Sequence, residues 1–224
     1  MALKQTATAA LALCAFSASV NADLIPVSFG TNWVAQAEHG GYYQAVADGT
    51  FNACGIDVTI VPGGPQVNGR AMLMAGKLDF YMGGNMLLAF NAVQQGIPLK
   101  VVAAHFQKEP QVLMTHPGKV KSFEEIKDLD KLIIGDNGFA SYYQWLITDF
   151  GFSAEKRVPY TFNPAPFIAD ENSAQQGYIT SEPFAVEKAA GFMPDIWLLA
   201  DYGFSTYSTT VETMQPTIDK TPEV

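Results

Sequence analysis

Cysteine is scarce in this chain, with two residues among 224, Cys14 and Cys54. Cys14 lies in an N-terminal apolar stretch that is typical of a cleavable export signal, so only Cys54 is expected to remain. A single cysteine excludes an internal disulfide, and the fold must therefore be stabilised by packing. This usage favours a bacterial periplasm over a disulfide-rich secreted mini-protein.

Positive charge is also scarce, because 13 Lys and Arg residues stand against 22 Asp and Glu residues, a formal net charge of −9. The sequence contains no cluster of Lys and Arg residues within this excess of acidic residues. A chain this acidic repels the phosphate backbone of nucleic acids. We therefore expect no nucleic-acid partner.

Long hydrophobic runs are confined to the N-terminus. Lys4 is the only charge before Asp23, an apolar stretch covers residues 9–20, and Val-Asn-Ala at 20–22 has the small-residue spacing of a cleavage site. We predict a signal peptide over residues 1–22 and hence export to the periplasm. The alternative is a buried N-terminal helix. No later segment is apolar for long enough to cross a bilayer.

Common catalytic and metal-binding signatures are missing, since the chain has no G-x-S-x-G, P-loop or H-E-x-x-H motif. His39, His105 and His116 are too widely separated for a zinc-ligand spacing. The glycine pairs at 63–64 and 83–84 lack the third glycine of a dinucleotide fingerprint. We expect no catalytic residue, no metal and no cofactor.

What the chain does contain is an alternation of strand and helix patterns. A helical spacing of Tyr42, Ala45 and Val46 is followed by the period-two pattern of a strand at 56–60. Strand patterns with helices between them recur at 78–82, 99–104, 111–115, 132–135, 178–180 and 196–200. This order predicts parallel pairing with right-handed crossovers. The break at 105–110 divides the series, which predicts two α/β lobes with a cleft between them.

Four helices are expected in the second series, among them one that begins near Pro166 and one that follows Ser181-Glu182-Pro183. Residues 122–125 form a capping box that predicts a short helix, and residues 141–150 have helical periodicity. A last helix is expected from Gln215-Pro216, but the sequence ends at Val224 before an apolar face accumulates. We expect a chain that is C-terminally short for its fold; a disordered tail is the alternative.

Polar residues with binding chemistry gather at the predicted strand ends. Asn32 and Trp33 combine an amide with a flat apolar ring, which suits a planar heteroaromatic ligand. Asn85 and Asn137 lie in Gly-containing turns that open helices, where backbone N–H groups favour an anion or a carbonyl oxygen. Glu182 could accept hydrogen bonds from an amino group. The alternatives are a core tryptophan, plain turn residues and a helix-capping carboxylate.

Several aromatic residues also lie near predicted element ends, where they could stack on a ligand or belong to the core. The complete candidate ligand-binding set is Asn32, Trp33, His39, Tyr42, Gly64, Asn85, Phe106, Asn137, Tyr142, Glu182 and Tyr202.

With these residues in place, the chain resembles the ThiY/SsuA-type solute-binding proteins of ABC importers. It is most similar to the branch that includes thiamine-pyrimidine precursor binders and the fungal pyrimidine synthase. The resemblance covers essentially everything after residue 22 and is carried by TNWVAQAEHGGYYQAVADGTF, VPGGPQVNGR, GKLDFYMGGN, QGIP, KSFEEIKDL, YQWL, TFNPAPFIAD and SEPFAVEKAAGF.

The resemblance implies a type II periplasmic binding fold, in which two α/β lobes close like a hinge over an interlobe cleft. It implies a first lobe over 23–104, a second over 105–199 and a return segment over 200–224. Asn32, Trp33, His39 and Glu182 match the family's pocket pattern. The implied partners are a small heteroaromatic ligand, such as a thiamine pyrimidine precursor, and an ABC permease, with the protein itself a monomer.

Two other functions remain open from the sequence. A pyrimidine-synthase-like enzyme would need the lysine and histidine that the resemblance places after the strand at 78–82. The sequence has Gly83, Gly84 and Asn85 there, and it lacks the family's cysteine cluster, so we expect no enzyme. A truncated, non-binding fragment is the other alternative. Riboflavin-type and alkylsulfonate ligands also stay possible.

Overall fold

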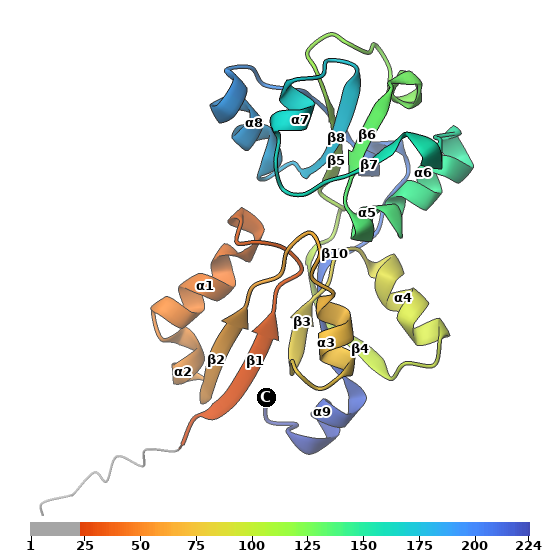
Figure 1. Ribbon diagram of the computed structural model, residues 1–224. Helices are drawn as coiled ribbons and strands as arrows, with labels where there is room; N and C mark the ends of the chain where they lie inside the picture. Colours follow the sequence, from red (N-terminus) through yellow and green to blue (C-terminus); the bar gives the residue numbers. More distant parts are fainter. Residues whose placement is uncertain (1–22) are drawn as a thin grey trace, which may run out of the picture.

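The computed structural model describes residues 23–224, so the signal peptide predicted over residues 1–22 lies outside the described residues. The described chain forms two α/β lobes, one above the other in Figure 1, each built on a five-stranded sheet. Across residues 23–224, no helix has the length and apolar character needed to span a membrane.

The first lobe is built on a sheet with the strand order β2-β1-β3-β10-β4. Its strands are β1 (Ile25–Gly30), β2 (Ile56–Val61), β3 (Phe80–Met82), β4 (Leu99–Phe106) and β10 (Ser208–Met214). Its helices are η1 (Ala37–His39), α1 (Gly40–Ala47), α2 (Thr50–Ala53), α3 (Gly69–Met74), α4 (Met86–Gln94) and α9 (Gln215–Lys220). β1 pairs in parallel with β2 and β3, whereas β10 runs antiparallel to β3 and β4.

The second lobe is built on a sheet with the strand order β7-β6-β8-β5-β9. Its strands are β5 (Gln111–Thr115), β6 (Lys131–Ile134), β7 (Arg157–Pro159), β8 (Ser173–Tyr178) and β9 (Asp195–Leu198). Its helices are η2 (Phe123–Asp128), α5 (Asp136–Phe139), α6 (Tyr142–Phe150), η3 (Ala154–Lys156), α7 (Ala165–Ile168), α8 (Glu182–Ala190) and η4 (Leu199–Tyr202). β5 is antiparallel to both of its neighbours, β8 and β9, and the other pairs are parallel.

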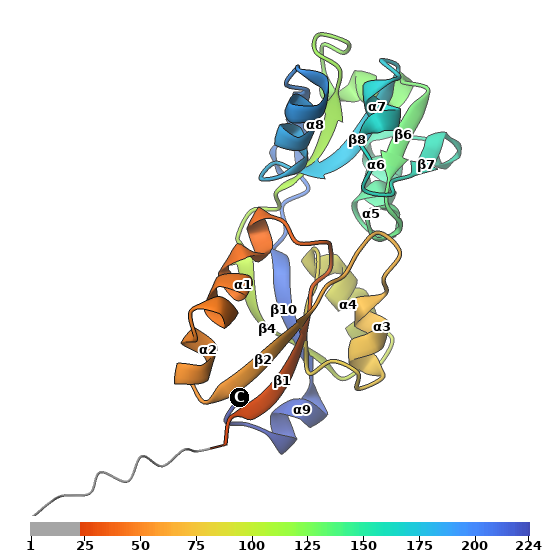
Figure 2. The same cartoon turned by 60° about the vertical axis from the view of Figure 1, so that its left-hand side comes forward.

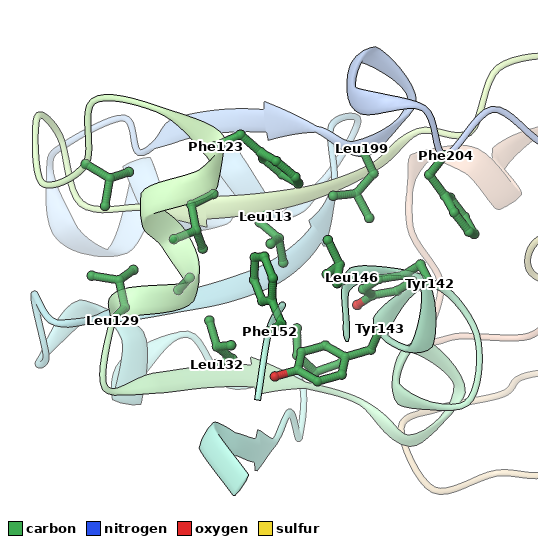
Figure 3. Close-up of a cluster of buried hydrophobic side chains, with 14 residues drawn as sticks. Leu113, Phe123, Leu129, Leu132, Tyr142, Tyr143, Leu146, Phe152, Leu199 and Phe204 are labelled. Carbon is green, nitrogen blue, oxygen red and sulfur yellow. The ribbon is translucent and has the colours of Figure 1, made fainter. Parts of the chain in front are cut away.

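Helices cover both faces of each sheet. In the first lobe, α1 and α2 lie on the side opposite to α3 and α4 (Figure 2). In the second lobe, α6 and η2 cover one face and α7 and α8 cover the other. The core beneath α6 includes Phe123, Tyr143, Leu146 and Phe152, which point toward one another in Figure 3. Alternate residues of each strand therefore face different cores, as the pleat requires.

The chain crosses between the lobes twice, at residues 107–110 and 203–207. The two crossings lie side by side, because Ser208 pairs with Phe106 and the Nδ1 atom of His105 lies 3.0 Å from the carbonyl oxygen of Thr209. Thr209 has a positive φ of 52°, which is unusual for a β-branched residue. Strained residues of this kind cluster at ligand clamps and switch regions.

Glu109 lies in the first crossing and is 1% exposed. Burial raises the pKa of its carboxyl group to about 8, although hydrogen bonds from Ser208, the Gln111 backbone and Tyr178 act in the opposite direction. Within the described chain, its Oε2 atom is buried without a hydrogen-bond partner. The hinge region therefore contains a carboxyl group that is held neutral near pH 7.

Several elements differ from the sequence predictions. The strand expected at 178–180 lies instead at β8, because the polar segment Ser173–Tyr178 is a central strand between β6 and β5. The helix expected at 122–125 is a 3-10 helix over Phe123–Asp128. The helix expected at 141–150 is confirmed as α6.

Candidate ligand-binding site between the lobes

A cavity lies between the lobes, at the edge where strands of both sheets end. Its volume is about 70 Å³. This holds a handful of water molecules, so the lobes enclose a chamber suited to a small molecule. The lining residues of the first lobe are Asn32, Trp33, Gln36, Glu38, Arg70, Tyr81, Gly84, Asn85 and Leu88. Those of the second lobe are Gln111, Asn137, Gly138, Ser141, Tyr142, Gln176, Gly177, Tyr178 and Glu182.

The topology explains why these residues converge. Asn32 follows β1, Asn85 follows β3, Asn137 follows β6 and Glu182 follows β8. These strands are parallel to their partners within each sheet, so their carboxyl ends lie at one edge. Loops beyond the carboxyl ends of such strands are the usual place for ligands in open α/β sheets.

His39 fixes the orientation of the Asn32 side chain. The backbone N–H of Gln36 donates to His39 Nδ1 over 3.2 Å, and His39 Nε2 lies 3.2 Å from Asn32 Oδ1. This arrangement requires a neutral ring that carries its proton on Nε2. Burial lowers the pKa of His39, despite the attraction of Glu38, which agrees with the neutral form. The Asn32 Oδ1 atom is thereby occupied, and its amide Nδ2 remains the group that can donate to a ligand.

Two polar contacts join the lobes beside the cavity. Gln36 Nε2 of the first lobe donates to Glu182 Oε1 of the second over 3.1 Å. Ser181 Oγ of the second lobe donates to Glu38 Oε2 of the first over 2.9 Å. Glu182 Oε2 also accepts from the backbone N–H of Tyr178 over 2.8 Å. The contacts of Gln36 with Glu182 and of Ser181 with Glu38 join the two lobes directly, and we refer to them as the latch contacts.

Trp33 contributes an apolar contact across the interface. Its ring lies 6.0 Å from Tyr160 at an interplanar angle of 19° and meets the edge of Phe162 at 6.0 Å. It also packs against the second-lobe cluster that contains Phe167 and Val186. Trp33 therefore links the lobes through its packing as well as lining the cavity.

Two buried polar atoms of the cavity wall have no hydrogen-bond partner among the described residues, Trp33 Nε1 and Asn85 Oδ1. The opposite end of the Asn85 amide is fixed, because its Nδ2 donates to Ser141 Oγ over 3.1 Å. Buried polar groups are normally paired. One donor and one acceptor on residues that line the cavity thus have no partner within residues 23–224.

Among residues 23–224, Arg70 is the only Lys or Arg that lines the cavity, and its guanidinium is already paired. Its Nε donates to Glu212 Oε2 over 2.9 Å and its Nη2 to Glu212 Oε1 over 2.6 Å. Thr210 also donates to Glu212, whose side chain is fully buried. A side chain on Gly83 would come within 2.0 Å of Glu212 Oε1, so this close approach explains the glycine. The bidentate pair joins α3 to β10.

The wall formed by the second lobe is held by its own hydrogen bonds. Gln176 Oε1 accepts from the Gly135 backbone N–H over 2.6 Å and from the Tyr142 hydroxyl over 3.0 Å. Burial raises the pKa of Tyr142 well above its ordinary value, so the hydroxyl keeps its proton. Ser141 Oγ donates to the carbonyl of Asn137 over 2.7 Å. These side chains are positioned before a ligand arrives.

The structure brings together six of the predicted site residues around the cavity: Asn32, Trp33, Asn85, Asn137, Tyr142 and Glu182. It places the other five away from the lining. His39 lies behind Asn32, and Tyr42 stacks on Phe29 at 4.3 Å in the first-lobe core.

Gly64, Phe106 and Tyr202 lie away from the cavity for different reasons. Gly64 follows β2 in a loop beside Val67, and Phe106 ends β4 at the hinge, opposite Ser208. Tyr202 stacks on Phe123 at 3.9 Å and belongs to the second-lobe core. An aromatic residue near an element end can face a core or a cleft, and spacing alone does not distinguish them.

Sequence reasoning missed other lining residues, chiefly Gln36, Glu38, Arg70, Tyr81, Gln111, Ser141, Gln176 and Tyr178. Glu38 lies next to the predicted site residue His39 in the sequence. Arg70 and Gln176 carried no sequence signal, because their roles depend on partners far along the chain. No group of three or more His, Cys, Asp and Glu residues suited to a metal ion occurs within residues 23–224.

Residues 36–224 match the family described as NMT1/THI5 like. No curated protein matches the chain in sequence. Solved structures with the same fold include a protein from Bordetella bronchiseptica RB50, with a TM-score of 0.69 and 11% identity over 90% of this chain and 67% of that one. Another is the periplasmic aliphatic sulphonate binding protein SsuA from Escherichia coli, with a TM-score of 0.58 and 16% identity over 88% of this chain and 68% of that one.

An ancestral arginine-binding protein bound to arginine is also similar, with a TM-score of 0.59 and 14% identity over 88% of both chains. The chain spans 67% and 68% of the length of the first two of these proteins. At such identities the structures show the fold, which is that of periplasmic binding proteins; SsuA and the ancestral arginine-binding protein are described as binding proteins. The chain belongs to the NMT1/THI5-like family and has the two-lobed fold of ABC-transporter solute-binding proteins.

Proposed function

We propose that this protein is the periplasmic substrate-binding component of an ABC importer, and that it captures a small heteroaromatic, amino-bearing compound. A thiamine pyrimidine precursor is the preferred candidate. Family membership and the two-lobed fold support the general role. The chemistry of the cavity supports the class of ligand.

The observation that carries the proposal is the pair of unpartnered polar atoms in the wall. Trp33 Nε1 is a donor and Asn85 Oδ1 is an acceptor, and both are buried at the cavity. An aminopyrimidine has ring nitrogens that accept and an exocyclic amino group that donates, so it can satisfy both. Glu182 offers a further acceptor for an amino group, and Asn32 Nδ2 a further donor. Flat aromatic walls suit a planar ring.

Lobe closure supplies the remaining part of the mechanism. The two crossings provide a hinge, and the contacts of Gln36, Glu182, Glu38 and Ser181 form only when the lobes meet. A ligand that touches both lobes stabilises the closed state over the open one, because it gains contacts only there. The closed form would then be the one that an ABC permease recognises.

The other ligand classes fit the cavity less well. A riboflavin-type compound has three fused rings and a ribityl chain, and it needs more space than a single-ring pyrimidine in this small chamber. An alkylsulfonate needs a cation or several free N–H groups, and Arg70 is already neutralised by Glu212. The turn after β3 holds Gly83, Gly84 and Asn85, which provide no amine for a Schiff base, and this supports a binding protein over an enzyme.

Calorimetry and thermal unfolding of the purified protein test the proposal with three compounds: 4-amino-5-hydroxymethyl-2-methylpyrimidine, riboflavin and an alkanesulfonate. A ligand present at a hundred times its dissociation constant stabilises the folded state by about 2.7 kcal/mol. For a chain of this size that raises Tm by about 5–11 °C. We expect this shift for the aminopyrimidine alone. A shift only for riboflavin or the sulfonate, or for none of the three, would overturn the proposed ligand class.

A further inference from the structure

Two buried carboxylates from opposite lobes line the same cavity. The Glu38 side chain of the first lobe is 3% exposed, and Glu182 of the second lobe is 4% exposed. They are neighbours in space, because Glu38 Oε2 accepts a hydrogen bond from Ser181, the residue that precedes Glu182. Closing the lobes therefore brings two acidic groups together in a place with little water.

Neither carboxylate has a cationic partner in the described part of the chain. The nearest basic group is His39, whose Nδ1 lies 4.0 Å from Glu38 Oε1. That nitrogen already accepts the Gln36 backbone N–H, so the ring is neutral and offers Glu38 no positive charge. Arg70 is held by both oxygens of Glu212. Arg70 and Glu212 neutralise each other, so Glu38 and Glu182 leave this group of four residues with a formal charge of −2.

Neutral hydrogen bonds satisfy these carboxylates only partly. Glu182 accepts one bond at each oxygen, from Gln36 and from the Tyr178 backbone. Glu38 accepts from Ser181 and from Thr180, the latter at 3.3 Å. Each carboxylate oxygen can accept two hydrogen bonds, so acceptor capacity is left on both. Burial raises the pKa of Glu182, and the charge of Glu38 adds to the effect. This is the expected response of a carboxylate whose charge is not compensated.

An independent feature also calls for a donor. Asn85 is 6% exposed, lines the same cavity and has a buried Oδ1 atom without a partner among residues 23–224. Its Nδ2 is committed to Ser141, which fixes the direction of the oxygen. The cavity therefore presents three groups of acceptors, two of them carboxylates, to a molecule between the lobes. A head group with several N–H donors and a positive charge satisfies all of them.

We propose, on the basis of the function proposed above, that the ligand enters with a positively charged, N–H-bearing head group, either an amidinium or a protonated amine, held between Glu38 and Glu182. The positive charge of the ligand is then required for the two lobes to close. Without it, the approach of two carboxylates opposes the latch contacts; with it, both lobes are attracted to the same group. A cation therefore has a differential affinity for the closed state, which a ligand needs in order to shift the equilibrium.

Three compounds with the same ring separate charge from shape: benzamidine, benzamide and benzenesulfonate, which are cationic, neutral and anionic at pH 7. Calorimetry with the complete protein should give benzamidine at least tenfold tighter binding than benzamide, and no measurable binding of benzenesulfonate. Glu38→Gln and Glu182→Gln should each reduce the preference for benzamidine over benzamide to threefold or less, mainly by weakening the binding of benzamidine. Glu187 lies on the exposed side of α8, so Glu187→Gln is the matched control. This variant should keep the preference for benzamidine over benzamide unchanged.

Each outcome bears on the proposal. Equal binding of benzamidine and benzamide, tightest binding of benzenesulfonate, or a preference that survives in both cavity variants would overturn it. If a variant does not fold, as judged by circular dichroism, competition of benzamide against benzamidine in the unchanged protein decides the question.

Binding measurements with the aminopyrimidine and with acetamidine distinguish failure of this inference from failure of the proposed function on which it depends. Aminopyrimidine binding without a charge preference would overturn the inference alone. Acetamidine binding without any binding of aromatic compounds would overturn the heteroaromatic ligand alone, and binding of no compound would overturn both.

Discussion

Replacing Glu109 of the hinge with glutamine should change how the unfolding free energy depends on pH. Its carboxyl group is 1% exposed, and its pKa is raised by burial from 4.5 to about 8. Between these two values the folded state holds a proton that the unfolded state releases. The contribution of this group to stability is therefore fully present below about pH 4.5 and is lost as the pH rises toward 8.

The magnitude follows from the shift of the pKa. Raising the pH from below 4.5 to above 8 removes about 5 kcal/mol from the free energy of unfolding, and the rise from pH 5 to pH 7 alone removes about 2.5 kcal/mol. In Glu109→Gln the amide is neutral at every pH and lacks this dependence. The difference in unfolding free energy, variant minus unchanged protein, should then rise by about 2.5 kcal/mol from pH 5 to pH 7.

Urea unfolding followed by tryptophan fluorescence at pH 5, 6 and 7 measures this difference, since titrations common to both proteins cancel. Glu187→Gln, at an exposed position of α8, should show a difference that does not vary with pH. A constant difference for Glu109→Gln, or one that falls with rising pH, would refute the assignment of a neutral carboxyl group to the hinge.

Three further substitutions test the site and its support. Trp33→Phe keeps an aromatic ring but removes the unpartnered Nε1, so ligand affinity measured by calorimetry should fall by about 0.5–1.5 kcal/mol with Tm nearly unchanged; a normal affinity would exclude that atom as a ligand contact. Glu212→Gln leaves Arg70 buried without its counter-charge and should lower the unfolding free energy by about 3–5 kcal/mol; a loss below 1 kcal/mol in urea unfolding would contradict a structural ion pair. Gly83→Ala should cost about 1–3 kcal/mol, because its Cβ would meet Glu212 Oε1 at 2.0 Å. Gly84→Ala, whose nearest neighbour would lie at 3.9 Å, is its control and should stay within about 0.5 kcal/mol; equal losses would show that the contact is not the cause.

The two-lobed α/β fold was accessible from the sequence because most strands and helices have clear periodicity. Tyr142 and Leu146 recur at helical spacing and are buried in α6, as predicted. β8 was placed too late in the chain, since the segment Ser173–Tyr178 is polar and looks unlike a buried strand. Its burial comes from its position between β6 and β5, which no local pattern encodes.

The site was predictable only in part, for a related reason. Asn32 and Glu182 stand at strand ends, and strand ends can be located from periodicity. Arg70 and Glu212 are 142 positions apart, and their pairing depends on α3 packing against β10. Tyr202 shows the opposite error. It was predicted to bind the ligand because it is an aromatic residue at an element end, but it lies in the second-lobe core. Local sequence predicts where loops fall, whereas long-range packing decides which side chains face the cavity.

The position of β10 in the first sheet has a consequence for biosynthesis. The second lobe is made from one continuous stretch, so a ribosome can complete it while residues 208–214 are still to be translated. The first lobe cannot assemble its sheet at that stage, because β10 lies between β3 and β4 and must be inserted last. Until then β3 and β4 present unpaired edges, which are prone to aggregation. The half of the molecule that is synthesised first is therefore the half whose sheet is completed last.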